Sequence, residues 1–144
     1  MKSVPTNGYC VVTGAAHGLG RAFAKELSQR QLNTILVDLP ENNLSGFCEE
    51  VRDQYQVSSC CYECDLTQKQ HITELAERIN NNYNVFLLIN NAGTGGTVRF
   101  ENATAEYLDR IIQLNVMATT LLTRLLIPNL LKQEKSYILN VSSM

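Results

Sequence analysis

Hydrophobic and polar positions along the chain fall into two alternating periodicities. Short apolar runs rich in β-branched residues predict strands at residues 9–13, 34–38, 58–64, 85–90 and 137–141. Between the strands, apolar residues recur at three- and four-residue spacing and predict helices at about 18–29, 44–55, 67–79 and 104–128. This alternation is typical of right-handed βα units. It predicts a doubly wound α/β fold, in which helices cover both faces of a parallel sheet.

Three details refine this pattern. The run VFLLI (85–89) is uninterrupted, which predicts a strand buried on both faces. Thr67 and Gln70 form a T-x-x-Q pattern, which predicts a capping box at the start of the third helix. Asn115 lies on the apolar stripe of the last helix, so the stripe predicts a buried amide that needs hydrogen-bond partners. From the residues alone, a structural role for Asn115 is favoured.

A glycine-rich turn joins the first strand to the first helix, in the stretch VVTGAAHGLG (11–20). Free backbone N–H groups at a helix start favour an anion such as a pyrophosphate. Gly14 would allow the tight turn, Gly18 the close approach of the phosphates, and Gly20 close packing of helix on sheet. The spacing differs from G-x-G-x-x-G and from the P-loop. A glycine turn without a ligand remains the alternative.

Asp38 ends the second strand, eighteen residues after Gly20. An acidic residue at this place accepts hydrogen bonds from the adenosine ribose of a dinucleotide. Its negative charge would repel a 2′-phosphate, which favours NAD over NADP. The alternative for Asp38 is a turn residue before Pro40.

Five stretches in this order resemble the short-chain dehydrogenase/reductase family: TGAAHGLG (13–20), CDLT (64–67), NNAG (90–93), LNV (114–116) and NVSS (140–143). The resemblance implies a Rossmann-type sheet with strand order 3-2-1-4-5, which we expect to be truncated after strand 5 because the last strands of the family's sheet are absent. It implies two catalytic residues, Asn115 and Ser143. It also implies a cofactor site formed by Gly14, Ala16, His17, Gly18, Leu19, Gly20, Asp38, Leu39, Asp65, Leu66, Asn91, Ala92 and Gly93.

The family's reaction is hydride transfer between a nicotinamide and a carbonyl or secondary alcohol. Its acid–base tyrosine lies in a Tyr-x-x-x-Lys motif after the fifth strand, and none of the six tyrosines here has a Lys four residues on. We therefore expect residues 1–144 to be one incomplete dinucleotide-binding domain, the amino-terminal portion of an NAD(P)-dependent oxidoreductase, with little activity alone. The alternatives are a non-catalytic dinucleotide-binding module and a structural association domain.

Composition and charge limit the classes of binding partner that we expect for this chain. The net charge is −2 and no two basic residues are adjacent, which argues against a nucleic-acid or membrane surface. The amino terminus lacks a signal-peptide core, so we expect a cytoplasmic protein. Cys61-x-x-Cys64 has no second pair to complete a zinc site, and reduced thiols are expected. We expect a small carbonyl or alcohol substrate, NAD as cofactor, no metal, and a homo-oligomer.

Overall fold

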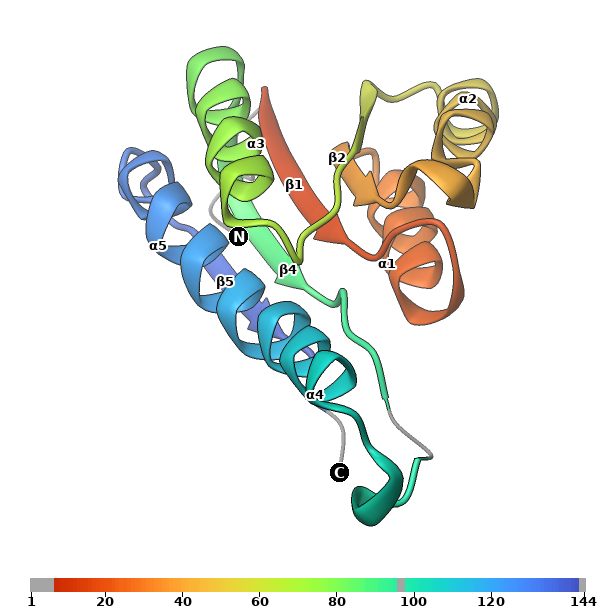
Figure 1. Cartoon of the computed structure of the whole chain (residues 1–144). Coiled ribbons are helices and arrows are strands. Elements are labelled where there is room, and N and C mark those ends of the chain that lie inside the picture. Colours follow the sequence, from red (N-terminus) through yellow and green to blue (C-terminus); the bar gives the residue numbers. More distant parts are fainter. Residues whose placement is uncertain (1–6, 96–97, 143–144) are drawn as a thin grey trace.

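The computed structural model describes residues 7–95 and 98–142, which form a five-stranded parallel sheet (Figure 1). Its strands are β1 (Gly8–Thr13), β2 (Asn33–Asp38), β3 (Ser59–Glu63), β4 (Asn84–Asn90) and β5 (Tyr137–Asn140). Their order is β3-β2-β1-β4-β5, which confirms the predicted order and the doubly wound class. The direction of winding reverses between β1 and β4, and a crevice opens there at the carboxyl ends of the strands.

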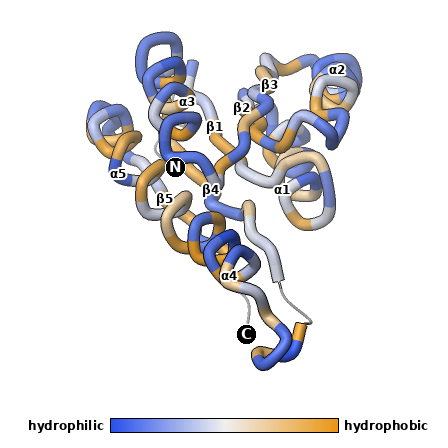
Figure 2. Tube along the Cα trace, viewed as in Figure 1, coloured by the Kyte–Doolittle hydropathy of each residue, from blue (hydrophilic) through white to orange (hydrophobic). Residues whose placement is uncertain are grey.

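Helices cover both faces of the sheet. They are α1 (Gly18–Gln29), α2 (Leu44–Tyr55), α3 (Lys69–Asn82), α4 (Ala105–Ile112) and α5 (Thr119–Leu130). Two short 3₁₀ turns, η1 (Pro40–Asn42) and η2 (Phe100–Asn102), lie in the connections. One apolar core lies between the sheet and α1 with α2, and a second lies between the sheet and α3 with α5. Figure 2 shows hydrophobic positions gathered on the strands and on the helix faces that meet them.

The central strands are buried as their apolar runs predict. Val11, Val12 and Leu88 are fully buried, and only Asn84 of β4 is exposed. Asn129 of α5 is also buried and has all its polar groups paired: its Oδ1 accepts from Val85 N at 2.9 Å, and its Nδ2 donates to Tyr83 O at 2.9 Å. This side chain therefore fixes α5 against the start of β4.

The start of α3 differs from the prediction. The helix begins at Lys69, and its N-cap residue Gln68 makes no side-chain capping hydrogen bond. The Thr67 hydroxyl instead donates to Asp65 Oδ1 at 2.7 Å. The predicted capping box between Thr67 and Gln70 is wrong because a nearer carboxylate takes the hydroxyl.

The last predicted helix is interrupted. Between α4 and α5 the backbone forms a π-helical segment, η3 (Gln113–Ala118), so the continuous helix has three parts. The stretch Ala105–Leu130 is long and apolar enough, by length and composition alone, to cross a membrane. In the structure its second half packs on α3 and β4, with Leu122, Leu126 and Leu130 buried in the core.

The fifth strand lies at the edge of the sheet with all four residues exposed, including Tyr137, Ile138 and Leu139. An edge strand offers unpaired backbone groups to another chain, so the homo-oligomer remains a prediction that this surface favours.

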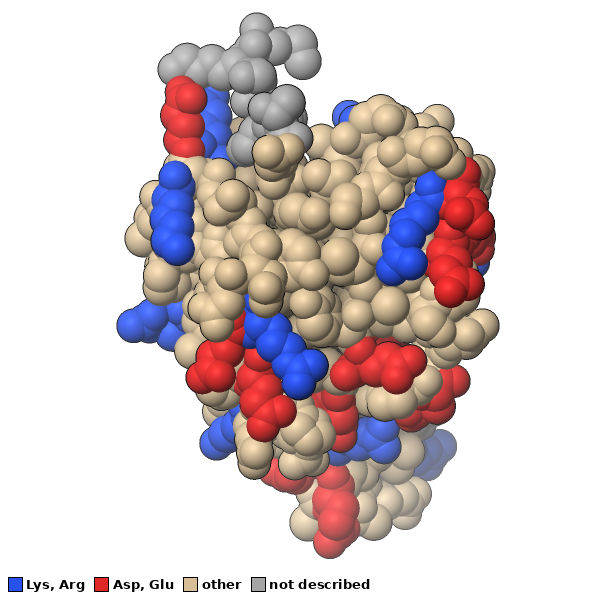
Figure 3. Space-filling view, turned by 90° about the horizontal axis from the view of Figure 1, so that it is seen from above, with Lys and Arg blue, Asp and Glu red and all other residues tan. Residues whose placement is uncertain are grey.

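Figure 3 shows the molecule from above, and on this face acidic and basic side chains are interspersed.

Both partners of the C-x-x-C pair carry free thiols and lie on opposite faces of the sheet. Cys61 packs with the α1–α2 core, and Cys64 lies in the α3–α5 core. Successive strand positions alternate between faces, so residues three apart separate as the spacing predicts.

Candidate functional site

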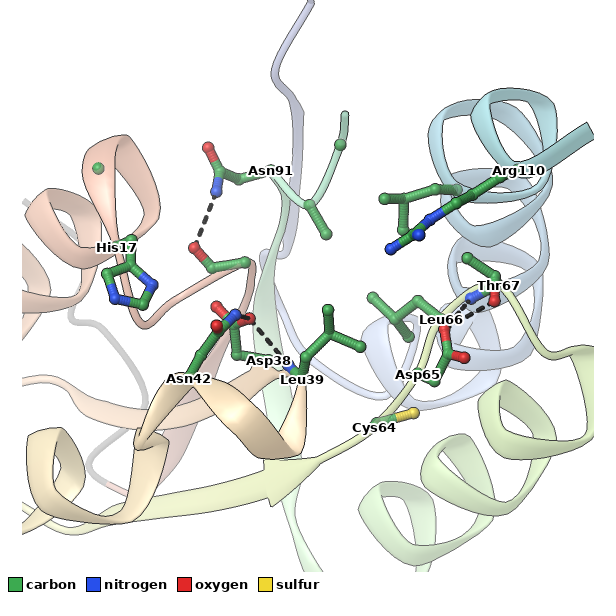
Figure 4. Close-up of a pocket in the computed structure, with 15 residues that line it drawn as sticks. His17, Asp38, Leu39, Asn42, Cys64, Asp65, Leu66, Thr67, Asn91 and Arg110 are labelled. Atoms are coloured by element: carbon green, nitrogen blue, oxygen red, sulfur yellow. Dashed lines mark hydrogen bonds between the residues drawn. The ribbon is translucent and has the colours of Figure 1, made fainter. Parts of the chain in front are cut away.

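A cavity of about 340 Å³ opens at the carboxyl ends of the strands, where the winding of the sheet reverses (Figure 4). Its walls come from the β1–α1 turn, the end of β2, the segment after β3, the loop after β4, and α4. The lining residues are Gly14, His17, Gly18, Asp38, Leu39, Asn42, Cys64, Asp65, Leu66, Thr67, Asn91, Ala92, Gly93, Arg110 and Leu114. Ten of these belong to the predicted cofactor set.

The glycine turn leaves room for a ligand on one side and packs tightly on the other. A side chain on Gly14 would meet Asn91 Nδ2 at 2.9 Å, and one on Gly20 would lie 1.9 Å from the Gly14 carbonyl oxygen. Gly18 has φ +52°, and a side chain there would meet nothing within 4 Å. The N-cap residue His17 makes no capping bond, so the first N–H groups of α1 face an open space suited to an anion.

Three residues of the predicted set lie beside the cavity and do not line it. Ala16 and Gly20 are buried, whereas Leu19 is 53% exposed. Ala16 contributes through its backbone: its N–H donates to Asp38 and its carbonyl accepts from Arg21.

Asp38 is held in a fixed orientation at the end of β2. Its Oδ2 accepts from Ala16 N at 2.8 Å. Its Oδ1 accepts from Leu39 N at 2.8 Å and from Asn42 Nδ2 at 2.6 Å. The carboxylate therefore reaches the cavity with a defined geometry, and each oxygen keeps acceptor capacity for a ligand hydroxyl. Asn42, on η1, was not predicted from the sequence.

Asp65 forms the opposite end of the cavity from the glycine turn. Its Oδ1 accepts from both Thr67 N and Thr67 Oγ1. Burial opposes ionisation of Asp65, but these hydrogen bonds, with His71 and Arg110 nearby, hold the pKa of the carboxyl below its usual range. Next to it, burial raises the pKa of the Cys64 thiol to about 11, so this cavity-lining cysteine is neutral.

The loop after β4 is tied to β1 by one hydroxyl. Thr13 Oγ1 accepts from Asn91 N and Ala92 N, both at 3.0 Å, and donates to Ile89 O. Asn91 Nδ2 donates back to the carbonyl of Thr13 at 3.0 Å. These bonds fix the strand ends on either side of the crevice.

Asn90 has a structural role in the sheet and is buried away from the cavity. Its Nδ2 donates to Thr123 Oγ1 at 2.9 Å and to Asn140 Oδ1 at 2.8 Å, linking β4 to α5 and β5. The N-N-A-G stretch thus divides into one structural asparagine and three cavity residues, Asn91, Ala92 and Gly93.

Asn115 is exposed, so its predicted burial is wrong: the described residues leave this side of η3 uncovered. Its partners are present nonetheless. Asn115 Oδ1 accepts from Thr94 N and its Nδ2 donates to Thr94 O, both at 2.8 Å. The side chain thus holds the loop that follows β4. Ser143, the other predicted catalytic residue, lies outside the described residues.

Two residues of α4 and η3 line the cavity and were not predicted. Leu114 precedes Asn115, and Arg110 lies one helical turn before Leu114. The four-residue spacing places them on one helix face, and this spacing was the available signal.

These features are typical of the Rossmann class of α/β folds: a glycine turn open to an anion, an oriented acid at the end of β2, and a cavity at the switch point of a parallel sheet. The sequence profile of the short chain dehydrogenase family matches residues 9–144. The chain belongs to this family.

Relatives with assigned names cover different activities. The chain is 29% identical over 145 residues to the very-long-chain 3-oxoacyl-CoA reductase of Anas platyrhynchos, covering 94% of this chain and 45% of the relative. It is 28% identical over 137 residues to the human inactive hydroxysteroid dehydrogenase-like protein 1, covering 94% and 42%. The chain thus spans about half the length of these relatives.

Solved structures share the fold closely. The bulky-bulky ketone specific alcohol dehydrogenase of Comamonas testosteroni superposes with a TM-score of 0.88 at 27% identity, covering 95% of this chain and 55% of that chain. A short-chain dehydrogenase from Sphingobium yanoikuyae in complex with NADPH gives a TM-score of 0.88 at 28% identity, covering 95% and 54%.

Proposed function

We propose that this chain is the dinucleotide-binding portion of an oxidoreductase that moves a hydride between a nicotinamide and a carbonyl or secondary alcohol, with NAD preferred over NADP. The observation that carries the proposal is the Asp38 carboxylate, fixed by three hydrogen bonds at a cavity that also contains the open glycine turn. A ribose diol needs such an oriented acceptor.

The cavity residues fit the parts of a dinucleotide in order along the crevice. The first turn of α1 would hold the pyrophosphate, because Gly18 leaves the space above it open. Asp38 would accept the ribose hydroxyls. Asp65 would face the adenine. Its Oδ2 makes no hydrogen bond within the described residues, so it can accept one from the adenine amino group.

The preference for NAD follows from charge. Asp38 accepts three hydrogen bonds that hold its carboxylate at the cavity, and this carboxylate would repel a 2′-phosphate. The next residue, Leu39, carries no charge to compensate. A related short-chain dehydrogenase from Sphingobium yanoikuyae was solved in complex with NADPH, so the comparison of NADH with NADPH decides this part of the proposal.

The bound nicotinamide would supply or accept the hydride. Asn115 would act near the reacting centre through the loop that it holds at Thr94, and Ser143 would polarise the substrate oxygen. The carbonyl class is supported by relatives named as a 3-oxoacyl-CoA reductase and a ketone-specific alcohol dehydrogenase. General acid–base catalysis contributes about 10²–10⁴-fold, so without a Tyr-x-x-x-Lys pair we expect this chain alone to turn over poorly.

A non-catalytic dinucleotide-binding module is the second candidate. It is favoured by the relative named as inactive. The two candidates share the cofactor site and differ in chemistry.

Titration of the 144-residue chain with NADH and NADPH, followed by nicotinamide fluorescence and calorimetry, tests the binding step. We expect NADH to bind at least about tenfold more tightly than NADPH. Equal affinities would overturn the NAD preference, and no binding of either would overturn the proposal. A single-turnover assay with bound NADH and aromatic ketones then separates the two candidates. Oxidation of NADH above the buffer background, even at a rate about 10²–10⁴-fold below that expected with general acid–base catalysis, supports the oxidoreductase, whereas binding with no oxidation above background supports the module.

A further inference from the structure

The side chain of Arg110 points from α4 into the cavity, from the side opposite His17 (Figure 4). It lines this cavity and also an adjoining one that includes Pro40 and Gln113. The residue therefore stands at the wall that the two cavities share.

The guanidinium of Arg110 is uncommitted. The salt bridges among the described residues use Arg21, Lys25, Arg30 and Arg99. Within the same part of the chain, no side-chain hydrogen bond of Arg110 is formed, although its charge reaches Asp65. Arg110 has five donors, forms no hydrogen bond or salt bridge through its side chain with any described residue, and points into the cavity, so its guanidinium is available to a ligand.

The ends of the cavity differ in chemistry, and this decides which ligand group Arg110 meets. The phosphate end is formed by Gly14, His17 and Gly18. Arg110 lies at the other end, with Leu66 and Leu114 as apolar neighbours in the lining. A phosphate would meet backbone N–H groups at the glycine turn, whereas a flat apolar ring would lie between Leu66 and the helix face that carries Arg110 and Leu114.

Resting on the proposed function, we propose that Arg110 covers the open face of the adenine ring by stacking its guanidinium plane on the purine. A guanidinium is planar, weakly hydrated and attracted to aromatic faces, which a lysine ammonium matches only in charge. Leu66, from the segment after β3, provides the apolar wall on the other side of the ring, and Leu114 lies beside Arg110 on the same helix face. Arg110 is thus a binding residue for the adenine and not for a phosphate.

The test compares the affinities of Arg110→Met, Arg110→Lys and wild type for fragments of the cofactor. Met keeps the length of the stem and removes plane and charge, whereas Lys keeps only the charge. Arg124→Met, at an exposed site on α5 outside both cavities, is the matched control. Calorimetric titrations use adenosine, 5′-AMP, 2′,5′-ADP, ADP-ribose and nicotinamide mononucleotide, and thermal melts verify that each variant is folded.

We expect Arg110→Met to weaken adenosine, 5′-AMP and ADP-ribose by about the same factor, roughly 5- to 10-fold. Nicotinamide mononucleotide should be unaffected, Arg110→Lys should lie between wild type and Met, and Arg124→Met should bind as wild type. A loss for 5′-AMP or 2′,5′-ADP without a loss for adenosine would assign Arg110 to a phosphate and overturn the inference. Unchanged affinities would overturn it while leaving the proposed function standing. If wild type itself bound no adenine compound, both would fail.

Discussion

The backbone N–H of Ala16 donates to Asp38 Oδ2 at 2.8 Å, so the acid that ends β2 also holds the glycine turn that follows β1. The same carboxylate accepts from Asn42 Nδ2 at 2.6 Å. Asp38 therefore has two functions. It orients the turn, and it presents its carboxylate to the cavity in which we propose that the ribose binds.

Replacing Asp38 by Asn should lower the affinity for NADH and should also change the selectivity between NADH and NADPH. The amide keeps one acceptor but loses the charge that repels a 2′-phosphate. We expect NADH affinity to fall about tenfold or more, because hydrogen bonds to a charged acceptor contribute roughly 1.5–3 kcal/mol. NADPH should lose less, so the ratio of the two dissociation constants should shift toward NADPH by about tenfold.

Fluorescence titration of both cofactors measures this ratio. Asp53→Asn, on the exposed side of α2, removes the same charge away from the cavity and should leave the ratio unchanged. A ratio that is also unchanged in Asp38→Asn would mean that the carboxylate does not face the ribose.

Substitutions at two glycines of the same turn should have different effects, one mainly on the stability of the fold and the other mainly on cofactor binding. Gly20→Ala would place Cβ 1.9 Å from the Gly14 carbonyl oxygen, and backbone must move to relieve that contact. We expect a loss of about 3 kcal/mol or more in the free energy of unfolding. In Gly18→Ala the new methyl group meets open space. The positive φ of this residue should therefore be the only cause of a lower free energy of unfolding, by about 1 kcal/mol. Its methyl group would instead occupy the phosphate position.

Urea denaturation and ADP-ribose titration of both variants test this contrast. Gly18→Ala should remain folded at 25 °C and bind ADP-ribose at least about tenfold more weakly, whereas Gly20→Ala should show its main defect in unfolding. If Gly18→Ala bound ADP-ribose with unchanged affinity, the proposal that the phosphates bind at the start of α1 would be wrong.

Thr13 offers a test of how the crevice is held open. Its hydroxyl accepts two N–H groups, from Asn91 and Ala92, and Thr13 is buried. Valine has the same shape but leaves both donors without a partner, at roughly 1–3 kcal/mol each. Thr13→Val should therefore lower the free energy of unfolding by about 2–4 kcal/mol, measured by urea denaturation. Thr13→Ser keeps the hydroxyl and should cost less than half as much; equal losses would point to the methyl group instead.

Most of the fold could be predicted because its signals are local. Uninterrupted apolar runs such as 85–89 locate the buried strands, and turn residues such as Gly14 and Gly18 mark a backbone with positive φ. The strand ends then bring Asp38, Asp65 and Asn91 to one edge of the sheet, so a parallel order is enough to assemble most of the cavity.

The residues that sequence reasoning misplaced depend on tertiary context. The apolar stripe of the last helix predicts burial, yet Ile112 on this stripe is 55% exposed because no described element packs on it. The π-helical turn at Asn115 has no local signature of the kind that glycine or proline gives. Arg110 was not predicted as a site residue, since only the position of α4 beside the crevice turns it toward the cavity.

Arg21 connects the glycine turn to α2, and this link depends on pH. Its Nη1 donates to the carbonyl of Ala16 at 3.2 Å, its Nη2 pairs with Glu50, and its guanidinium lies 3.9 Å from the ring centre of Phe47. Glu50 also pairs with Lys25 at 2.7 Å. The hydrogen bond from Lys25, together with Arg21, holds the pKa of the Glu50 carboxyl below its usual value.

A lowered folded-state pKa means that Glu50 stabilises the fold above its unfolded pKa, about 4.3, and that this stability is lost as pH falls through the lower folded value. Glu50→Gln should therefore be less stable than wild type at pH 7, with the difference shrinking toward zero as pH falls below 4. Urea midpoints measured from pH 7 to pH 3 give this difference directly. Glu26→Gln, which breaks only the exposed pair with Arg30, should change the midpoint little at any pH. A Glu50→Gln difference that stayed constant across this range would show that the side chain acts by packing, because a charge interaction must disappear when the carboxylate is protonated.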